Sequence, residues 1–299
     1  MSPIVIVRYG ELGLKSAPVR REFERTLRRN LLDQFLSAKS ECRIRADHGH
    51  LYIESTDAGS AAALGRRVFG VTSVSVAHEL ATDVAAISQE VLRLGDGELT
   101  PGRRFAIRAR RTGQHPFSSQ ELAAQLGEVV LEHWPERALK VDLTHPEVEV
   151  FVEVRGPRTY IYFGRRRGPG GLPLGVAGTV VALVDGPRGA LGAFLMMKRG
   201  CRAFLVTTSD GEDLARSVLL RFDPKAVIQQ LPADALSSGP ILNEIATGSG
   251  ADGIVLPLLV DDYPSAREVW GDRVVFSPTV GFTDEEVLAR WRSVQELLT

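Results

Sequence analysis

The segment RRFAIRARRTGQHPFSSQELAAQLG, from Arg103 to Gly127, decides how the middle of this 299-residue chain folds. Apolar residues such as Phe105 and Ile107 alternate with charged or small ones, a period of two that predicts a half-buried strand with a cationic outer face. The spacing of Ser118 and Glu121 is that of a capping box, which predicts that a helix begins there. The segment therefore indicates a strand, a turn and a helix.

Arginines are concentrated at the start of this segment. They are Arg103, Arg104, Arg108, Arg110 and Arg111. Because no acidic residue precedes Glu121, we expect a cationic surface without a neutralising partner, next to a helix N-terminus where an anion is stabilised. The alternative interpretation is a solvated face of an ordinary domain.

A second run of arginines follows Glu153 without an acidic residue among them. It comprises Arg155, Arg158, Arg165, Arg166 and Arg167. The net charge of −1 hides an asymmetry, since residues 1–175 contain 25 Lys and Arg against 21 Asp and Glu, and residues 176–299 contain 11 against 16. Local clusters of this kind suit phosphate contacts, which depend on local charge.

The composition, 44% hydrophobic and 24% charged, is that of a globular protein with two or three domains. No apolar run reaches the length of a membrane span, and the first residues lack the layout of a secretory signal, so we expect a cytoplasmic protein without a membrane partner. Cys42 and Cys201 are isolated, so the sequence predicts neither a disulfide framework nor a metal site.

The N-terminal part reads as strand, helix, strand, strand, helix and strand, the ferredoxin-like order. The predicted helix has Phe23, Leu27, Leu31 and Phe35 at a spacing of four and arginines on its exposed face. After residue 175 the order changes to alternating strands and helices: strand 180–184, loop 185–189, helix 190–199 and strand 202–207. A loop after the first strand of such a unit is where nucleotide phosphates usually bind, although a plain α/β domain without a ligand is favoured.

Several segments resemble one known family, the tRNA 4-thiouridine synthetase (tRNA sulfurtransferase) family. The segments are RYGELGLKS at 8–16, RRTGQHPFSSQELAAQLG at 110–127, VFVEVRGPRTYIYFGRRRGPGGLPLG at 150–175, KRGC at 198–201 and VVFSPTVGFTDEEV at 274–287. The resemblance runs in register over residues 1–205. It implies an α+β N-terminal half followed by a small α/β Rossmann-like domain derived from the PP-loop fold.

The resemblance implies four parts of the chain. They are a ferredoxin-like domain at 1–78, a THUMP RNA-binding domain at 79–167, a linker at 168–179 and a reduced PP-loop-like domain at 180–299. It also implies that tRNA binds near its acceptor end. The residues expected to contact RNA are Lys15, Arg21, Arg25, Arg104, Arg108, Arg110, Arg111, Ser118, Arg165, Arg166 and Arg167.

This sequence departs from the family's phosphate-binding pattern, S-G-G-x-D-S. The pattern falls on Val184, Asp185, Gly186, Pro187, Arg188 and Gly189. Only one glycine matches, and an acidic residue stands where small residues let backbone N–H groups hold phosphate. The family's sulfur-carrying cysteine is also missing, because no cysteine follows Cys201. We therefore expect no catalytic residues and no cofactor, with ATP possible only if this degenerate loop still binds it.

The main hypothesis is a tRNA-binding protein that is catalytically inactive or accessory in tRNA modification. One alternative is an active ATP-dependent tRNA sulfurtransferase that forms 4-thiouridine. A second is an interaction module for another tRNA-modifying enzyme, and a third is a metabolic nucleotide-binding enzyme, which lacks the phosphate loop it needs. A homodimer and a partner enzyme are both compatible with the resemblance.

Overall fold

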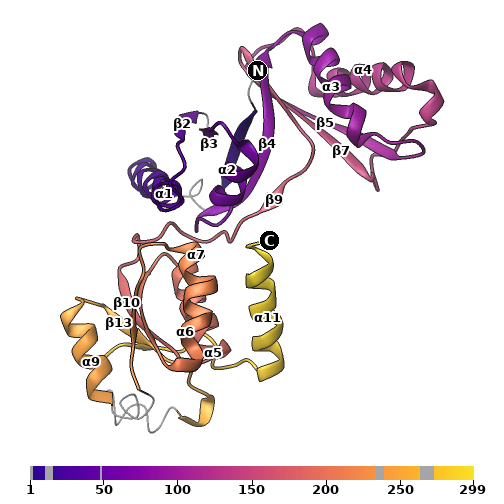
Figure 1. The fold of residues 1–299 in the computed structure, drawn as a ribbon. Helices are drawn as coiled ribbons and strands as arrows, with labels where there is room; N and C mark the ends of the chain where they lie inside the picture. The colour runs from indigo at the N-terminus through magenta and orange to yellow at the C-terminus, as the bar shows by residue number, and fades with distance from the viewer. Residues whose placement is uncertain (1–2, 11–15, 48, 233–238, 263–272) are drawn as a thin grey trace. The chain divides into compact units, whose positions relative to one another are not determined.

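The computed structural model describes residues 3–10, 16–47, 49–232, 239–262 and 273–299 (Figure 1). Two compact units emerge from the contacts between residues. The first contains Met1–Ile6, Tyr52–Ala62 and Val74–Arg166, and the second contains Val7–Leu51, Ala63–Ser73 and Arg167–Thr299. Among the described residues, no helix combines the length and the apolar content needed to cross a membrane.

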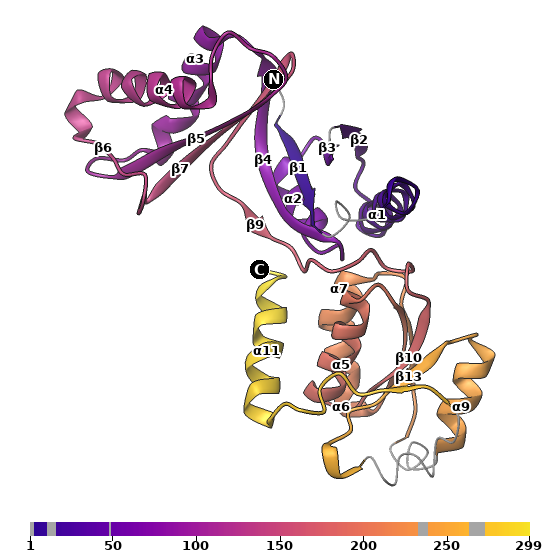
Figure 2. The same cartoon turned by 180° about the vertical axis from the view of Figure 1, so that it is seen from behind.

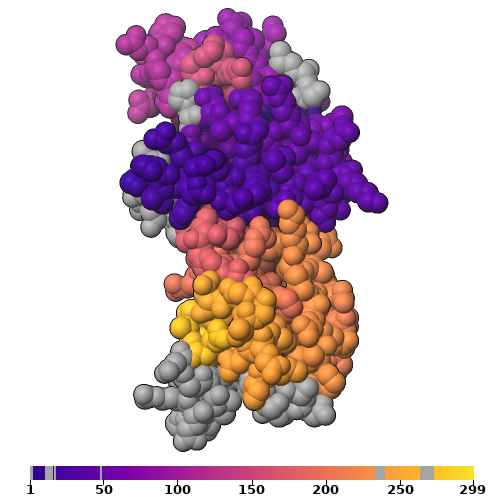
Figure 3. All heavy atoms as spheres, turned by 90° about the vertical axis from the view of Figure 1, so that its left-hand side faces the viewer, coloured from indigo at the N-terminus to yellow at the C-terminus, as the bar shows by residue number. Residues whose placement is uncertain are grey.

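The first part of the chain follows the predicted ferredoxin-like order. Its elements are β1 (Ile4–Tyr9), α1 (Ala17–Ser37), β2 (Arg43–Asp47), β3 (His50–Glu54), α2 (Ala58–Gly65) and β4 (Val71–Ala81). Helix α1 buries the predicted Leu27, Leu31 and Phe35 and exposes its arginines, and it contributes to the face shown in Figure 3. The ferredoxin-like prediction is confirmed.

The next part holds the segment that decides the fold. Its elements are α3 (Val84–Glu98), β5 (Arg104–Thr112), α4 (Ser119–His133), a 3-10 turn (Pro135–Arg137), β6 (Lys140–Val141), β7 (Val148–Arg155), β8 (Arg158–Tyr162) and β9 (Arg166–Arg167). The strands join one mixed sheet in the order β2-β3-β1-β4-β8-β7-β5-β6, and β9 pairs with β4. Helices α3 and α4 pack on β5 and β7 around a core that includes Leu122, Leu126 and Val130.

The C-terminal part is an α/β domain. Its elements are β10 (Thr179–Val184), α5 (Pro187–Lys198), β11 (Arg202–Thr207), α6 (Ser209–Leu214), a π-helical turn (Ala215–Leu219), α7 (Leu220–Phe222), β12 (Val227–Gln230), α9 (Gly239–Gly248), β13 (Gly253–Val255), a 3-10 turn (Val260–Asp262), β14 (Val275–Phe276) and α11 (Asp284–Glu296). The five strands are parallel, in the order β12-β11-β10-β13-β14. Figures 1 and 2 show α5 and α11 on one face of this sheet and α9 on the other.

Two element boundaries differ from the sequence-based expectation. Helix α5 begins at Pro187 and not at Ala190, because proline fits the first helical position, where no intrahelical N–H partner is needed. The apolar run from Gly253 to Leu259 predicts a longer strand, but β13 ends at Val255. Its pairing continues only through the N–H of Leu256, since Pro257 has no N–H to donate.

One feature of α1 was not predicted: a stripe of buried polar residues beside its apolar stripe. Asn30 and Gln34 are 5% and 4% exposed. The amide of Asn30 donates to the carbonyl of Leu174, and that of Gln34 donates to the carbonyls of Arg221 and Phe222. These bonds fasten α1 to the C-terminal domain, in the same compact unit.

Candidate functional site

Strand β5 and helix α4 form as the sequence predicts. Phe105 and Ile107 are buried in the strand, and α4 begins with a complete capping box. The Ser118 hydroxyl accepts from the N–H of Glu121 at 3.1 Å, and the Glu121 carboxylate accepts from the N–H of Ser118 at 2.7 Å. This local chemistry fixes the turn that joins the cationic end of β5 to the helix.

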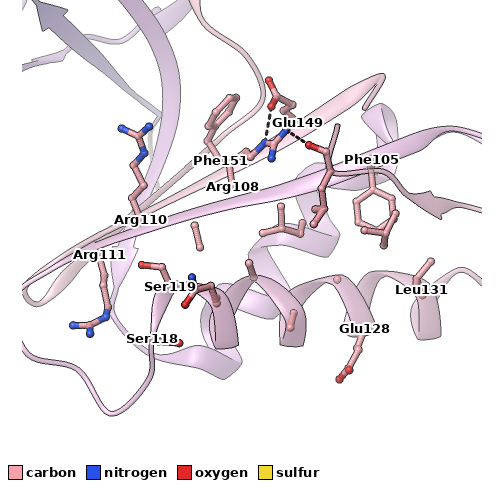
Figure 4. A pocket seen from close by; sticks show the side chains of 18 of the residues that line it. Phe105, Arg108, Arg110, Arg111, Ser118, Ser119, Glu128, Leu131, Glu149 and Phe151 are labelled. Carbon is pink, nitrogen blue, oxygen red and sulfur yellow. Dashed lines mark hydrogen bonds and ion pairs between the residues drawn. The ribbon is translucent and has the colours of Figure 1, made fainter. Parts of the chain in front are cut away.

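A groove of about 1280 Å³ lies along β5, β7 and α4, within the first compact unit. It brings together five of the predicted residues, Arg108, Arg110, Arg111, Ser118 and Arg165. Figure 4 shows Arg110 and Arg111 at one end of the groove, with Phe105 and Leu131 at the other. Arg111 extends on the side of β5 where Ser118 and Ser119 lie, and Arg110 extends on the opposite side. The groove thus has a cationic end and an apolar end.

Three of the arginines at the start of the segment are neutralised, which corrects the expectation of a strand without acidic partners. Arg104 lies 3.2 Å from Asp142 and 3.4 Å from Glu147, and Arg103 lies 3.4 Å from Glu147. Arg108 donates to Glu149 at 2.7 Å and to the carbonyl of Leu143 at 2.8 Å (Figure 4). These acids lie about forty residues away in sequence, but the parallel pairing of β5 with β6 and β7 brings them alongside.

Hydrogen bonds from the backbone keep two of these carboxylates ionised. The N–H groups of His145 and Thr144 lower the pKa of Asp142, with a smaller contribution from Arg104. The N–H of Arg104 lowers the pKa of Glu147, and the Arg104 and Arg103 side chains act in the same direction. The partners of Arg103 and Arg104 are therefore charged at neutral pH.

Arg110 and Arg111 are the arginines of this strand that stay available. Both are exposed, and neither lies within 4 Å of a carboxylate in the described part of the chain. Among the described residues, Arg111 donates only to the carbonyl of Gly113, at 3.0 Å. Ser118, in contrast, has its hydroxyl and its N–H engaged by Glu121, so the capping box already supplies the helix N-terminus with a carboxylate.

Arg165 also lines the groove, together with Phe151. The centre of its guanidinium lies 4.5 Å from the centroid of the Phe151 ring. It also donates to the Tyr162 hydroxyl at 3.1 Å and lies 3.9 Å from Glu153, a carboxylate only 5% exposed. Glu153 was not predicted as part of a site. Its contacts depend on the pairing of β7 with β8, which the sequence alone does not reveal.

The other predicted RNA-contacting residues lie elsewhere. Arg166 and Arg167 form the short strand β9 and are exposed. Arg21 and Arg25 are exposed on α1, in the second compact unit, and Arg25 pairs with Glu22 at 2.6 Å. Lys15 lies outside the described residues.

The predicted phosphate loop connects β10 to α5, at the carboxyl edge of the parallel sheet. Strands β10 and β13 are neighbours where the strand order reverses, which is where open α/β sheets bind ligands. The loop proper is only Asp185 and Gly186, since Pro187, Arg188 and Gly189 belong to the first turn of α5.

Helix α6 lies directly against this loop. A Cβ on Gly211 would overlap the carbonyl oxygen of Val184, and the N–H of Thr208 donates to that same oxygen at 3.4 Å. Around Gly186, by contrast, a Cβ would meet no atom within 4 Å. The loop is therefore packed on its α6 side and open at Gly186.

The positive charge of the loop is engaged within the C-terminal domain. Arg188 is only 14% exposed and donates to the carbonyls of Thr279 and Phe282 and to Asp284, each at 2.8 Å. Asp185 keeps an exposed edge, but desolvation by the surrounding loop raises the pKa of its carboxyl group. Among the described residues, no three side chains of His, Cys, Asp or Glu lie close enough together to hold a metal ion.

Two known domain families match the chain. The ThiI ferredoxin-like domain matches residues 4–75, and the THUMP domain matches residues 81–163. Every residue that lines the candidate groove except Arg165 lies within the second match.

Curated relatives carry the name tRNA sulfurtransferase. A probable tRNA sulfurtransferase of Methanobrevibacter smithii is 38% identical over 238 residues, which are 78% of this chain and 60% of that protein. The tRNA sulfurtransferase of Pyrobaculum aerophilum is 38% identical over 205 residues, 66% of this chain and 40% of that protein. The chain thus spans about half the length of such relatives, with 48% and 52% for two further archaeal proteins.

Two solved structures superpose on nearly the whole chain. PH1313 from Pyrococcus horikoshii has a TM-score of 0.83 at 26% identity and covers 98% of this chain and 100% of its own. A 4-thiouridine synthetase in complex with RNA and bound ATP has a TM-score of 0.81 at 23% identity, with coverage of 98% and 85%. Both likenesses include the C-terminal α/β domain, which therefore shares its fold with the corresponding part of these proteins.

Proposed function

The chain belongs to the tRNA sulfurtransferase family, with its ferredoxin-like, THUMP and C-terminal α/β domains, and from this premise we propose that it binds tRNA through the β5–β7–α4 groove. The observation that carries the proposal is the pair Arg110 and Arg111, exposed at the end of the groove without an acidic partner among the described residues. Phosphate contacts of this type supply much of the affinity for nucleic acids. The RNA complex of the 4-thiouridine synthetase supports the choice of partner.

We propose that the expected RNA contacts among the described residues divide into four groups. Arg110, Arg111 and Arg165 contact RNA directly, whereas Arg104 and Arg108 stay paired with carboxylates. Ser118 serves mainly as the cap of α4. Arg21, Arg25, Arg166 and Arg167 remain candidates for contacts with the body of a tRNA.

One variant reports on RNA in the groove without removing an arginine. Glu149→Gln deletes a negative charge that lines the groove and leaves Arg108 without its carboxylate partner. We expect tRNA affinity, measured by fluorescence anisotropy at low salt, to rise about threefold to tenfold, because repulsion of phosphate is removed. Glu147→Gln, outside the residues that line the groove, is the control and is expected to change affinity less. An unchanged or weaker affinity for Glu149→Gln would contradict RNA binding at this place.

For the C-terminal domain we propose an accessory role in tRNA modification, in the cytoplasm and without nucleotide chemistry at the β10–α5 loop. Its support is the loop alone: Arg188 is engaged by Thr279, Phe282 and Asp284, and Asp185 stands where phosphate would lie. These residues do not fit a nucleoside triphosphate. A phosphate-binding loop needs small residues with free backbone N–H groups, and this loop has a carboxylate there instead. Dimerisation and contact with a tRNA-modifying enzyme are the roles that such a domain would keep.

A second function, ATP-dependent tRNA sulfur transfer, is favoured by the names of the relatives, which support it better than they support the accessory role. The two are separated by incubating the protein with ATP, Mg²⁺ and unmodified tRNA and measuring pyrophosphate. The accessory role predicts no tRNA-dependent pyrophosphate above the background without protein. Release that depends on both protein and tRNA would establish the enzyme and refute the accessory role.

A further inference from the structure

A stack of flat groups forms one wall of the groove. The guanidinium of Arg165 lies over the ring of Phe151, at 4.5 Å from the centroid, and that ring stacks on Tyr162 at 4.9 Å with an angle of 8° between the planes. Arg165 and Phe151 both line the groove, and 33% of the Arg165 side chain is exposed. A planar cation is thus held with part of its surface open to whatever enters the groove.

A buried carboxylate holds this guanidinium in place. The Tyr162 hydroxyl donates to Glu153 at 2.5 Å and accepts from the Nη2 group of Arg165 at 3.1 Å. Glu153 also forms an ion pair with Arg155 at 2.8 Å. Because these partners are buried and satisfied together, the orientation of Arg165 is set before any ligand arrives, which lowers the entropic cost of binding.

Two uses of the arginines in the groove follow from their partners. Arg110 and Arg111 have no carboxylate partner in the described structure, so their hydrogen-bonding edges suit phosphate. In Arg165 the Nη2 group already contacts Tyr162 and Glu153, so one end of its hydrogen-bonding edge is occupied. The flat surface of the guanidinium remains partly exposed. A flat guanidinium surface suits a nucleobase, because bases stack on arginine planes as they do on aromatic rings.

We propose that Arg165 and Phe151 form a platform on which one unpaired nucleobase stacks, with Tyr162 and Glu153 as positioning residues. The proposal rests on the proposed function, since it assigns a binding mode to RNA in the same groove. It predicts that the groove distinguishes RNA with bases from the same backbone without them.

The test uses fluorescein-labelled hexa-adenylate and a hexamer of abasic ribose with the same phosphates. We expect the protein to bind hexa-adenylate about tenfold more tightly in an anisotropy titration, because one stacked base contributes on that order. Arg165→Lys keeps the charge but not the plane, so it is expected to lose most of this preference while binding of the abasic hexamer changes less than about twofold. Equal binding of both probes by the wild type, or a full preference in Arg165→Lys, would overturn the platform.

Tyr162→Phe tests the positioning role, because it keeps the ring stacked on Phe151 and removes only the hydroxyl that holds Arg165. We expect the preference for bases to fall severalfold with abasic binding unchanged, and an unchanged preference would overturn the role of Tyr162. Thermal unfolding checks that the variant is folded, and Arg110→Lys is the matched control that should keep the preference.

Wild-type binding of whole tRNA is measured alongside: its absence refutes the proposed function, whereas tRNA binding without a base preference refutes only the platform.

Discussion

Replacing Arg110 and Arg111 together by alanine is expected to weaken tRNA binding about thirty-fold at low salt, or roughly 2 kcal/mol. Both side chains are exposed at the end of the groove, and neither has a carboxylate within 4 Å among the described residues. Each can therefore form a charge-assisted contact with a phosphate, which contributes about 1 kcal/mol or more. The measurement is an anisotropy titration of labelled tRNA with the wild type and the double variant.

The matched control is Arg103→Ala with Arg104→Ala, which removes the same formal charge at the start of the same segment. Those two arginines are already paired with Glu147 and Asp142. We expect their loss to weaken binding less than about threefold, because the carboxylates neutralise most of the field they would offer. Similar losses in both double variants would show that net charge alone attracts the RNA and that the groove is not its site.

Gly211→Ala is expected to destabilise the C-terminal domain by about 3 kcal/mol. The added Cβ would overlap the carbonyl oxygen of Val184, and since that atom is backbone, α6 must move away from the loop. Thermal unfolding should show a lower midpoint for the C-terminal domain, by about 10 °C. Base-bearing hexa-adenylate should still bind, since the groove lies in the other compact unit.

Gly186→Ala is the control for this prediction, because it adds the same methyl group to the same loop. A Cβ on Gly186 would meet no atom within 4 Å, and its φ of 173° is extended backbone that alanine also adopts. We expect its unfolding midpoint to stay within about 2 °C of the wild type. If Gly211→Ala is as stable as Gly186→Ala, α6 does not pack on the loop as described.

Patterns that depend on neighbouring residues in sequence predicted the fold well. The alternation around Phe105 and Ile107 gave β5, and the spacing of Ser118 and Glu121 gave the start of α4. Thr283 and Glu286, which have the same spacing in the sequence as Ser118 and Glu121, form the capping box of α11. Each of these signals is local, so the residues that carry it also form the structure. The domain boundaries at 78, 167 and 179 stay predictions.

Features that depend on distant partners were not predictable in the same way. The acid-free run of arginines suggested a surface without carboxylates, yet β5 pairs in parallel with β7 and places Glu149 beside Arg108. The burial of Asn30 and Gln34 in α1 could not be predicted from neighbouring residues, because carbonyl groups about 140 to 190 residues away accept their hydrogen bonds. Sequence charge alone therefore overstated how many arginines are available to RNA.

The salt dependence of tRNA affinity tests most directly whether RNA is held in this groove by its free arginines. Affinity is measured between about 50 and 200 mM salt for the wild type and for the Arg110→Ala, Arg111→Ala variant. We expect a steep linear fall of log affinity with log salt in the wild type, and a slope smaller by about 1.4 to 1.8 in the variant, because each lost phosphate contact removes about 0.7 to 0.9. A flat wild-type response, or identical slopes for the two proteins, would contradict the account.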